Sequence, residues 1–153
     1  MNKPIAAELL VRRKFNVGRE LVFAAFTDAK ALQHWIAPQR DIKTKVIEFN
    51  FHIGGRYRFE FLLPDGTLTF LIGEYQIIDP PNKLSFTWCW EKPDPHAGID
   101  SLVTVEFIDN NNMTELVISH VKFETTEMKQ RHAEGWSGTL TRLQAWLDKT
   151  IPI

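Results

Sequence analysis

Six segments of alternating polar and apolar residues follow one another between Thr44 and Phe123, and one long amphipathic helix comes after them. The period of two predicts strands. They are expected over residues 44–51, 56–63, 67–78, 84–90, 101–109 and 113–123. Turn sequences separate them, for example PDG at residues 64–66, so neighbouring strands should pair as an antiparallel meander.

The long helix begins near Thr125 and Thr126, either of which can cap it, and continues to about Lys149. Its apolar residues recur at intervals of four, three and four on one face, at Trp136, Leu140, Leu143 and Leu147. Residues 7–17 predict a first strand. Two short helices should follow it, the second capped by Asp28 and running through Trp35.

This order of elements limits the architecture. A twisted antiparallel sheet of about seven strands curls, which leaves one concave apolar face. The C-terminal helix is the only long element able to cover that face. The sequence therefore predicts an α+β fold: a curved antiparallel sheet around a long C-terminal helix, with two short helices after the first strand. No repeat or linker divides residues 1–153, so we expect one domain.

The charge pattern excludes several classes of protein. The net charge is −1, and the 18 basic residues are interspersed with 19 acidic ones, so we expect no nucleic-acid partner. No apolar run approaches the roughly 18 residues of a membrane span, and the charged N-terminal segment does not resemble a signal peptide. Cys89 is the single cysteine, which rules out an internal disulfide. We expect a cytoplasmic protein.

Aromatic residues are unusually frequent, with eleven Phe, five Trp and two Tyr. On a concave sheet they form either a dense core or the wall of an apolar cavity. The candidate wall residues on the strands are Phe59, Phe61, Phe70, Trp88 and Trp90, and those on the helix are Trp136, Leu140 and Leu143. Alternation alone leaves both interpretations open.

Two polar residues alternate with apolar ones in predicted strands. His120 shares a face with Leu116 and Ile118, so it is either a structural histidine or a polar anchor for a ligand. Glu74 shares a face with Phe70, so it is either a carboxylate inside the cavity or an exposed edge residue.

Five landmarks in order resemble one known family. They are FNVGRELVFAAFTDAKALQHWIAP, GGRYRFEF with the following PDG, GEYQIIDPPNKLSFTW, TELVISH and HAEGWSGTLTRLQAWL. Together they resemble the START-like (SRPBCC) superfamily, in the branch named for homologues of the activator of the heat-shock-protein-ninety ATPase, in its single-domain bacterial form.

The resemblance implies a helix-grip (START/Bet v 1-like) fold with a cavity between helix and sheet. In this superfamily such cavities bind lipids, polyketides, hormones or other apolar molecules. The resemblance also places Trp35 near the cavity opening, where its side chain would either gate the opening or pack against the core. The chain starts almost directly at the first strand, so we expect the additional N-terminal domain of the eukaryotic cochaperone to be absent.

Catalytic and metal-binding patterns are missing from the sequence. The five histidines lack metal-ligand spacing, Cys89 has no neighbouring base, and neither G-x-S-x-G nor a phosphate-binding glycine loop occurs. We therefore expect no metal and no other cofactor, and no catalytic residue is assigned.

Three hypotheses for function remain. The first is a protein that binds an apolar small molecule, and the second is an interaction module that binds a chaperone or another protein in a stress response. The third is an enzyme of the cyclase, dehydratase or hydrolase kind that uses His120, Glu74 and Arg58. Monomer and homodimer are both compatible with the sequence.

Gly135 interrupts the apolar face of the predicted helix, at a cost of about 1 kcal/mol relative to alanine. Its missing side chain either lets the sheet approach closely or leaves room beside Trp136. Gly135→Leu should therefore destabilise the fold or block ligand entry, as measured by thermal unfolding and ligand binding. An unchanged melting temperature together with unchanged binding would contradict this role.

Overall fold

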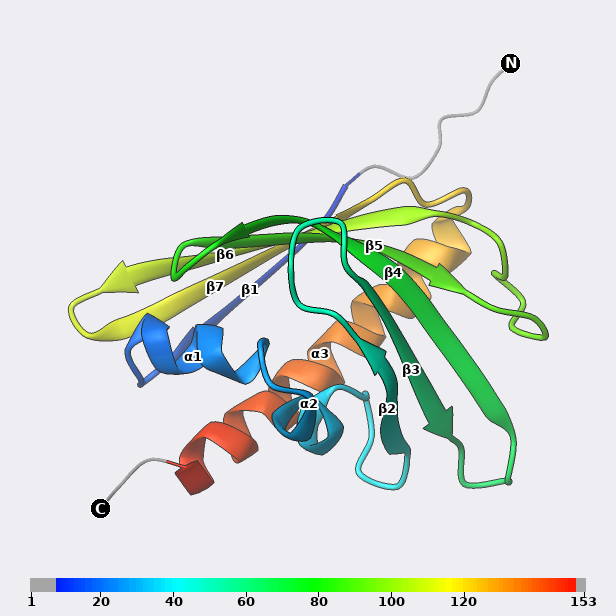
Figure 1. Ribbon diagram of the computed structural model, residues 1–153, viewed down its shortest axis with the longest axis horizontal. Coiled ribbons are helices and arrows are strands. Elements are labelled where there is room, and N and C mark those ends of the chain that lie inside the picture. Colours follow the sequence, from blue (N-terminus) through cyan, green and yellow to red (C-terminus); the bar gives the residue numbers. More distant parts are fainter. Residues whose placement is uncertain (1–7, 151–153) are drawn as a thin grey trace.

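A computed structural model describes residues 8–150 of the chain. Its main feature is an antiparallel sheet in which strands that are neighbours in sequence mostly pair with one another. Seven strands form one antiparallel sheet in the order β1-β7-β6-β5-β4-β3-β2 (Figure 1). Their bounds are β1 Leu9–Phe15, β2 Lys43–Phe49, β3 Arg56–Leu62, β4 Leu68–Asp79, β5 Lys83–Trp90, β6 Ser101–Asn110 and β7 Met113–Val121. The predicted six-strand meander is confirmed, and β1 joins its far edge beside β7.

The first strand is tied to the sheet across a long stretch of chain. The predicted strand began at Ala7, which lies outside the described residues. From Leu9 to Phe15, β1 pairs with β7 without a break. Just beyond it, the buried hydroxyl of Thr114 donates to the carbonyl of Val17 at 2.7 Å, a residue 97 positions away. This bond fixes the chain where it leaves the sheet.

Three helices complete the fold within the described residues: α1 Arg19–Ala25, α2 Ala29–Trp35 and α3 Thr126–Thr150. The predicted caps are present. The Asp28 carboxylate accepts a hydrogen bond from the Lys30 amide at 3.1 Å, and the Thr125 hydroxyl accepts one from the Met128 amide at 3.0 Å. Each cap satisfies an amide that would otherwise lack a partner at a helix start.

The long helix lies on the concave side of the sheet, and the sheet bends from β7 and β6 toward β3 and β2 around it (Figure 1). The four apolar residues predicted to share one helix face are all buried: Trp136, Leu140, Leu143 and Leu147. Residues from most strands complete the core, including Phe15, Leu71, Leu84, Val105, Phe107 and Ile118. The predicted α+β class and helix-grip fold are confirmed.

The two glycines of α3 have different surroundings. A Cβ placed on Gly138 would lie 2.3 Å from the backbone oxygen of Pro38, whereas one placed on Gly135 would meet no atom within 4 Å. Close approach therefore occurs at Gly138, where the segment between α2 and β2 crosses the helix. The Arg142 guanidinium binds the same segment by donating to the carbonyls of Ala37 and Gln39, and it also donates to the His34 carbonyl in the last turn of α2.

This difference predicts opposite effects of one substitution. Gly135→Ala should raise the melting temperature by about 2–4 °C, because alanine stabilises a helix by about 1 kcal/mol relative to glycine. Gly138→Ala should lower it, because backbone displacement costs about 1–3 kcal/mol and exceeds that gain. Thermal unfolding of both variants beside the wild type measures the effect. Equal shifts in the two variants would show that the contact with Pro38 is unimportant.

Candidate functional site

A cleft of about 470 Å³ lies between the N-terminal half of α3 and the sheet. The hairpin between β3 and β4, the loop after β5 and the segment after α2 form its remaining sides. The residues that line it are Ile36, Ala37, Pro38, Gln39, Ile42, Phe61, Leu63, Thr67, Leu68, Thr69, Trp88, Trp90, Pro93, Asp94, Pro95, Arg131, His132, Glu134, Gly135, Trp136 and Thr139. Most of these contribute apolar surface.

Four of the predicted wall residues come together in this cleft: Phe61, Trp88, Trp90 and Trp136. Strand alternation places Trp88 and Trp90 on one face of β5, and their rings meet edge to face at 5.9 Å. The Trp136 ring of α3 lies 5.2 Å from Trp88, and Phe61 lies 5.8 Å from Trp90. Gly135 also lines the cleft, so its missing side chain leaves room beside Trp136.

Four other predicted residues belong to the core and do not line the cleft. Phe59, Leu140 and Leu143 are buried among core side chains. Trp35 is fully buried, and its indole N–H donates to the Ala25 carbonyl at 3.1 Å. This position fits the packing alternative for Trp35, because a gating residue needs exposure to the opening.

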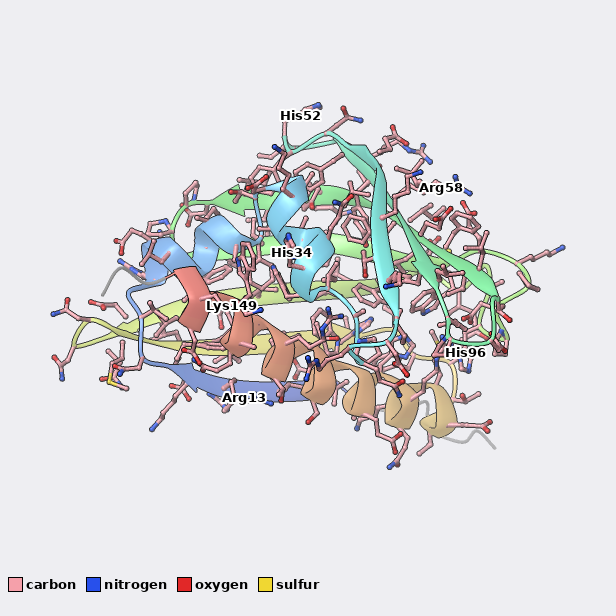
Figure 2. The ribbon with its side chains drawn as sticks, turned by 90° about the horizontal axis from the view of Figure 1, so that it is seen from below. Arg13, His34, His52, Arg58, His96 and Lys149 are labelled. Carbon is pink, nitrogen blue, oxygen red and sulfur yellow. The ribbon has the colours of Figure 1, made fainter. Side chains whose placement is uncertain are left out.

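Phe70 was assigned to the wrong side of the sheet, and of the two alternatives for Glu74 the structure supports the exposed position. Glu74 is exposed, and the Arg58 guanidinium lies 4.2 Å above the Phe70 ring. The alternation in β4 was read correctly, but both sets of alternating residues contain large apolar side chains. Leu71 and Tyr75 are the buried set, so Phe70, Ile72 and Glu74 face outward. Figure 2 shows Arg58 on the outside of β3, away from α3.

His120 is fully buried behind the tryptophans and does not line the cleft. Its Nδ1 accepts a hydrogen bond from the Trp136 indole at 3.1 Å, and its Nε2 lies 2.8 Å from the Ser101 hydroxyl. An indole N–H can only donate, so Nδ1 carries no proton and the ring is neutral. Burial, followed by repulsion from His132, lowers the pKa of His120. This residue positions Trp136.

A second indole–imidazole pair connects β5 to α3. The Trp90 N–H donates to His132 Nε2 at 3.0 Å, so the imidazole proton lies on Nδ1 and is donated to the Met128 carbonyl at 2.8 Å. Burial lowers the pKa of His132 to about 4. Two tryptophans of the cleft wall therefore have their indole groups held by neutral histidines.

A polar cluster that no sequence pattern predicted lies at the mouth of the cleft. Asp94 accepts two hydrogen bonds from Arg131, at 2.9 and 2.7 Å, and Arg131 Nη1 lies 2.6 Å from His96 Nδ1. The guanidinium carbon lies 4.9 Å from the centre of the Trp90 ring. In Figure 2, His96 lies in the loop beside the N-terminal end of α3.

Electrostatics favour a charged pair in this cluster. Burial raises the pKa of the Asp94 carboxyl, but hydrogen bonds from Arg131 and the His96 amide outweigh it and leave the pKa below its usual value. The sequence showed DPH in a proline-rich loop, but nothing local indicated that an arginine 37 positions away would face it.

The side chains proposed for catalysis do not converge. Arg58 forms an ion pair with Glu91 at 2.9 Å on the outer face, Glu74 is exposed, and both ring nitrogens of His120 have partners. Within residues 8–150, no three histidine, cysteine or acidic side chains are grouped to hold a metal ion. The part of the chain that the structure describes also contains no helix long and apolar enough to cross a membrane.

This chain is similar to a known protein family and to several solved structures. The family model described as activator of Hsp90 ATPase homolog 1-like protein matches residues 16–148. An AHSA1 protein from Silicibacter pomeroyi has a similar crystal structure, with a TM-score of 0.84 and 26% identity over 95% of this chain and 100% of that one. A search of curated proteins finds no match.

Two further structures share the fold. A Chromobacterium violaceum protein has a TM-score of 0.81 and 23% identity, over 93% of this chain and 97% of that one. An Arthrobacter aurescens protein, solved by NMR, has a TM-score of 0.82 and 22% identity, over 97% of this chain and 90% of that one.

Burial of neutral His132 predicts a dependence of stability on pH. The pKa of about 4 in the folded protein is below the ordinary 6.5, so the unfolded chain takes up a proton first as the solution is acidified. Neutral His132 contributes its full share to the free energy of unfolding only above about pH 6.5. About 2 kcal/mol of this free energy should be lost between about pH 6.5 and pH 5. Denaturant unfolding at several pH values measures this slope.

The matched variants are His132→Gln and His52→Gln. The first removes one of two buried neutral imidazoles and should reduce the slope between these pH values, while the lowered pKa of His120 keeps the remainder. His52 is exposed in the turn between β2 and β3, so its substitution should leave the slope unchanged. A wild-type slope in the His132 variant would contradict the assignment.

Proposed function

Since this chain belongs to the activator of Hsp90 ATPase homolog 1-like family, we propose that it binds an apolar small molecule in the cleft between α3 and the sheet. The observation that carries the proposal is the cleft itself, with about 470 Å³ of space and a wall of aromatic side chains. Small-molecule sites commonly have volumes of about 300–1,000 Å³ and are lined mainly by apolar residues.

The energetics favour an apolar ligand of moderate size. Burying about 200 Å² of apolar ligand surface contributes about 5 kcal/mol before ordering costs are subtracted. The indole groups of Trp90 and Trp136 are already hydrogen-bonded to histidines. Their ring surfaces are therefore held in place before a ligand arrives, which reduces the entropy lost on binding.

The other two hypotheses have less support from the structure. An interaction module typically has a filled interior and an exposed apolar patch that binds its partner. The interior contains a cleft, and exposed large apolar residues occur on several elements, for example Leu10 in β1 and Leu21 in α1. The cross-strand pair Leu62 and Leu68 lies in the hairpin that borders the cleft. The enzyme hypothesis required polar side chains that converge in the cavity, and its three candidates do not line the cleft.

A fluorescence titration with N-phenyl-1-naphthylamine, an uncharged apolar probe, tests the proposal. We expect saturable enhancement with the wild-type protein and at least about tenfold weaker binding by Gly135→Leu, because the new side chain occupies the cleft beside Trp136. Native mass spectrometry of the purified protein can then identify a ligand that remains bound.

The matched control is Ala145→Leu, which adds a similar side chain at an exposed position of the same helix. Its affinity should equal that of the wild type, and both variants should retain a cooperative thermal transition. Absence of binding to the wild-type protein, or equal binding by all three proteins, would contradict a binding site in this cleft.

A further inference from the structure

We infer that the ligand of this cleft is an uncharged molecule with a hydrogen-bond-accepting oxygen, such as a ketone, ester or amide carbonyl, and that Arg131 binds this oxygen. The inference rests on the proposed function, because it names the chemistry that the same cleft selects. It comes from the hydrogen-bonding capacity of the Arg131 guanidinium, its fixed position and the charges around it.

Two of the five N–H groups of Arg131 are unused. Nη1 faces Asp94 Oδ1 at 2.9 Å and His96 Nδ1 at 2.6 Å, and Nη2 donates to Asp94 Oδ2 at 2.7 Å. The Nε–H and the second Nη2–H have no acceptor among residues 8–150. These two hydrogens lie on the same edge of the planar group, where they can donate together to one oxygen or to a pair of oxygens.

The position of this edge is fixed before any ligand binds. The Asp94 side chain is only 5% exposed, and its carboxylate also accepts a hydrogen bond from the His96 amide at 2.8 Å. The Trp90 ring supports the flat face of the guanidinium. Arg131 lines the cleft and its side chain is 36% exposed, so its guanidinium is accessible to a molecule bound there.

The surrounding charges distinguish an uncharged oxygen from a carboxylate. Asp94 already neutralises Arg131, and Glu134 also lines the cleft. His132 is held neutral by the hydrogen bond from Trp90. A carboxylate in the cleft would therefore lie near two acidic side chains and one arginine, whereas a carbonyl oxygen accepts the same hydrogen bonds without that repulsion.

Arg131 is a better candidate than the two buried polar atoms of cleft residues that have no partner in the part of the chain that the structure describes. Trp88 Nε1 and Thr69 Oγ1 have no hydrogen-bond partner among the described residues, but both atoms are closed off from solvent by their neighbours. A molecule in the cleft does not reach either atom without displacing side chains. Arg131 combines access from the cleft with a fixed orientation.

Three naphthalenes of nearly equal size test the inference by isothermal titration calorimetry: 2-acetylnaphthalene, 2-isopropylnaphthalene and 2-naphthoate. We expect the ketone to bind the wild-type protein at least about tenfold more tightly than the hydrocarbon, as is typical of a hydrogen bond from a charged donor. The carboxylate should bind more weakly than the ketone.

Arg131→Gln should reduce the preference for the ketone over the hydrocarbon to about twofold or less, because glutamine cannot supply the two-hydrogen edge. Arg58→Gln is the matched control. Arg58 also forms a two-bond pair with a carboxylate, Glu91, and stacks on an aromatic ring, but it lies on the outer face of the sheet. This variant should keep the wild-type preference.

A second measurement needs no variant and separates a lost contact from a misfolded protein. In ¹H–¹⁵N spectra of the wild type, the Arg131 Nε–H resonance should move on adding 2-acetylnaphthalene and stay in place on adding 2-isopropylnaphthalene. Equal affinities for these two probes with an unmoved resonance would overturn the inference and leave the proposed function intact.

The remaining outcomes are also decisive. Tightest binding of 2-naphthoate would overturn the assignment of an uncharged ligand. Failure of all three probes to bind would contradict the proposed function, and the inference would fall with it.

Discussion

One narrow helix has to cover a wide sheet, and the rest of this structure depends on that mismatch. Seven strands spaced about 4.8 Å apart form a sheet roughly 30 Å wide, whereas a helix with its side chains is about 10–12 Å across. Curling the sheet around α3 buries the middle of the concave face, and α1 and α2 fill one end. Neither α1 nor α2 covers the part of the concave face between β3, β5 and the N-terminal half of α3, and the cleft lies there.

The aromatic wall of the cleft depends on polar groups behind it. Tryptophan offers a large rigid surface, but its buried N–H needs an acceptor. In this protein two neutral histidines supply acceptors, and each also donates or contacts a second partner: His132 reaches a helix carbonyl and His120 lies beside Ser101. The histidines serve the cleft indirectly, by fixing the rings that line it.

Pattern reasoning predicted most of the fold, because the periods of strand and helix are local properties. The faces of β3 and β5, the four apolar residues of α3 and the caps Asp28 and Thr125 were all readable from short segments. It failed at β4, where both faces carry large apolar residues and only the packed structure selects Leu71 over Phe70. The pair of Asp94 and Arg131 was invisible for another reason, since no local pattern links a loop residue to a helix residue so distant in sequence.

The bond between Thr114 and Val17 marks where this topology is slow to assemble. Each hairpin of the meander joins strands that are neighbours in sequence, so only a short loop closes before hydrogen bonds form. Pairing β1 with β7 closes a loop of about 100 residues, and its entropy is lost before the first contact compensates for it. The strand made first on the ribosome thus finds its partner only after β7, the last strand, has been synthesised, and during that interval β1 stays unpaired.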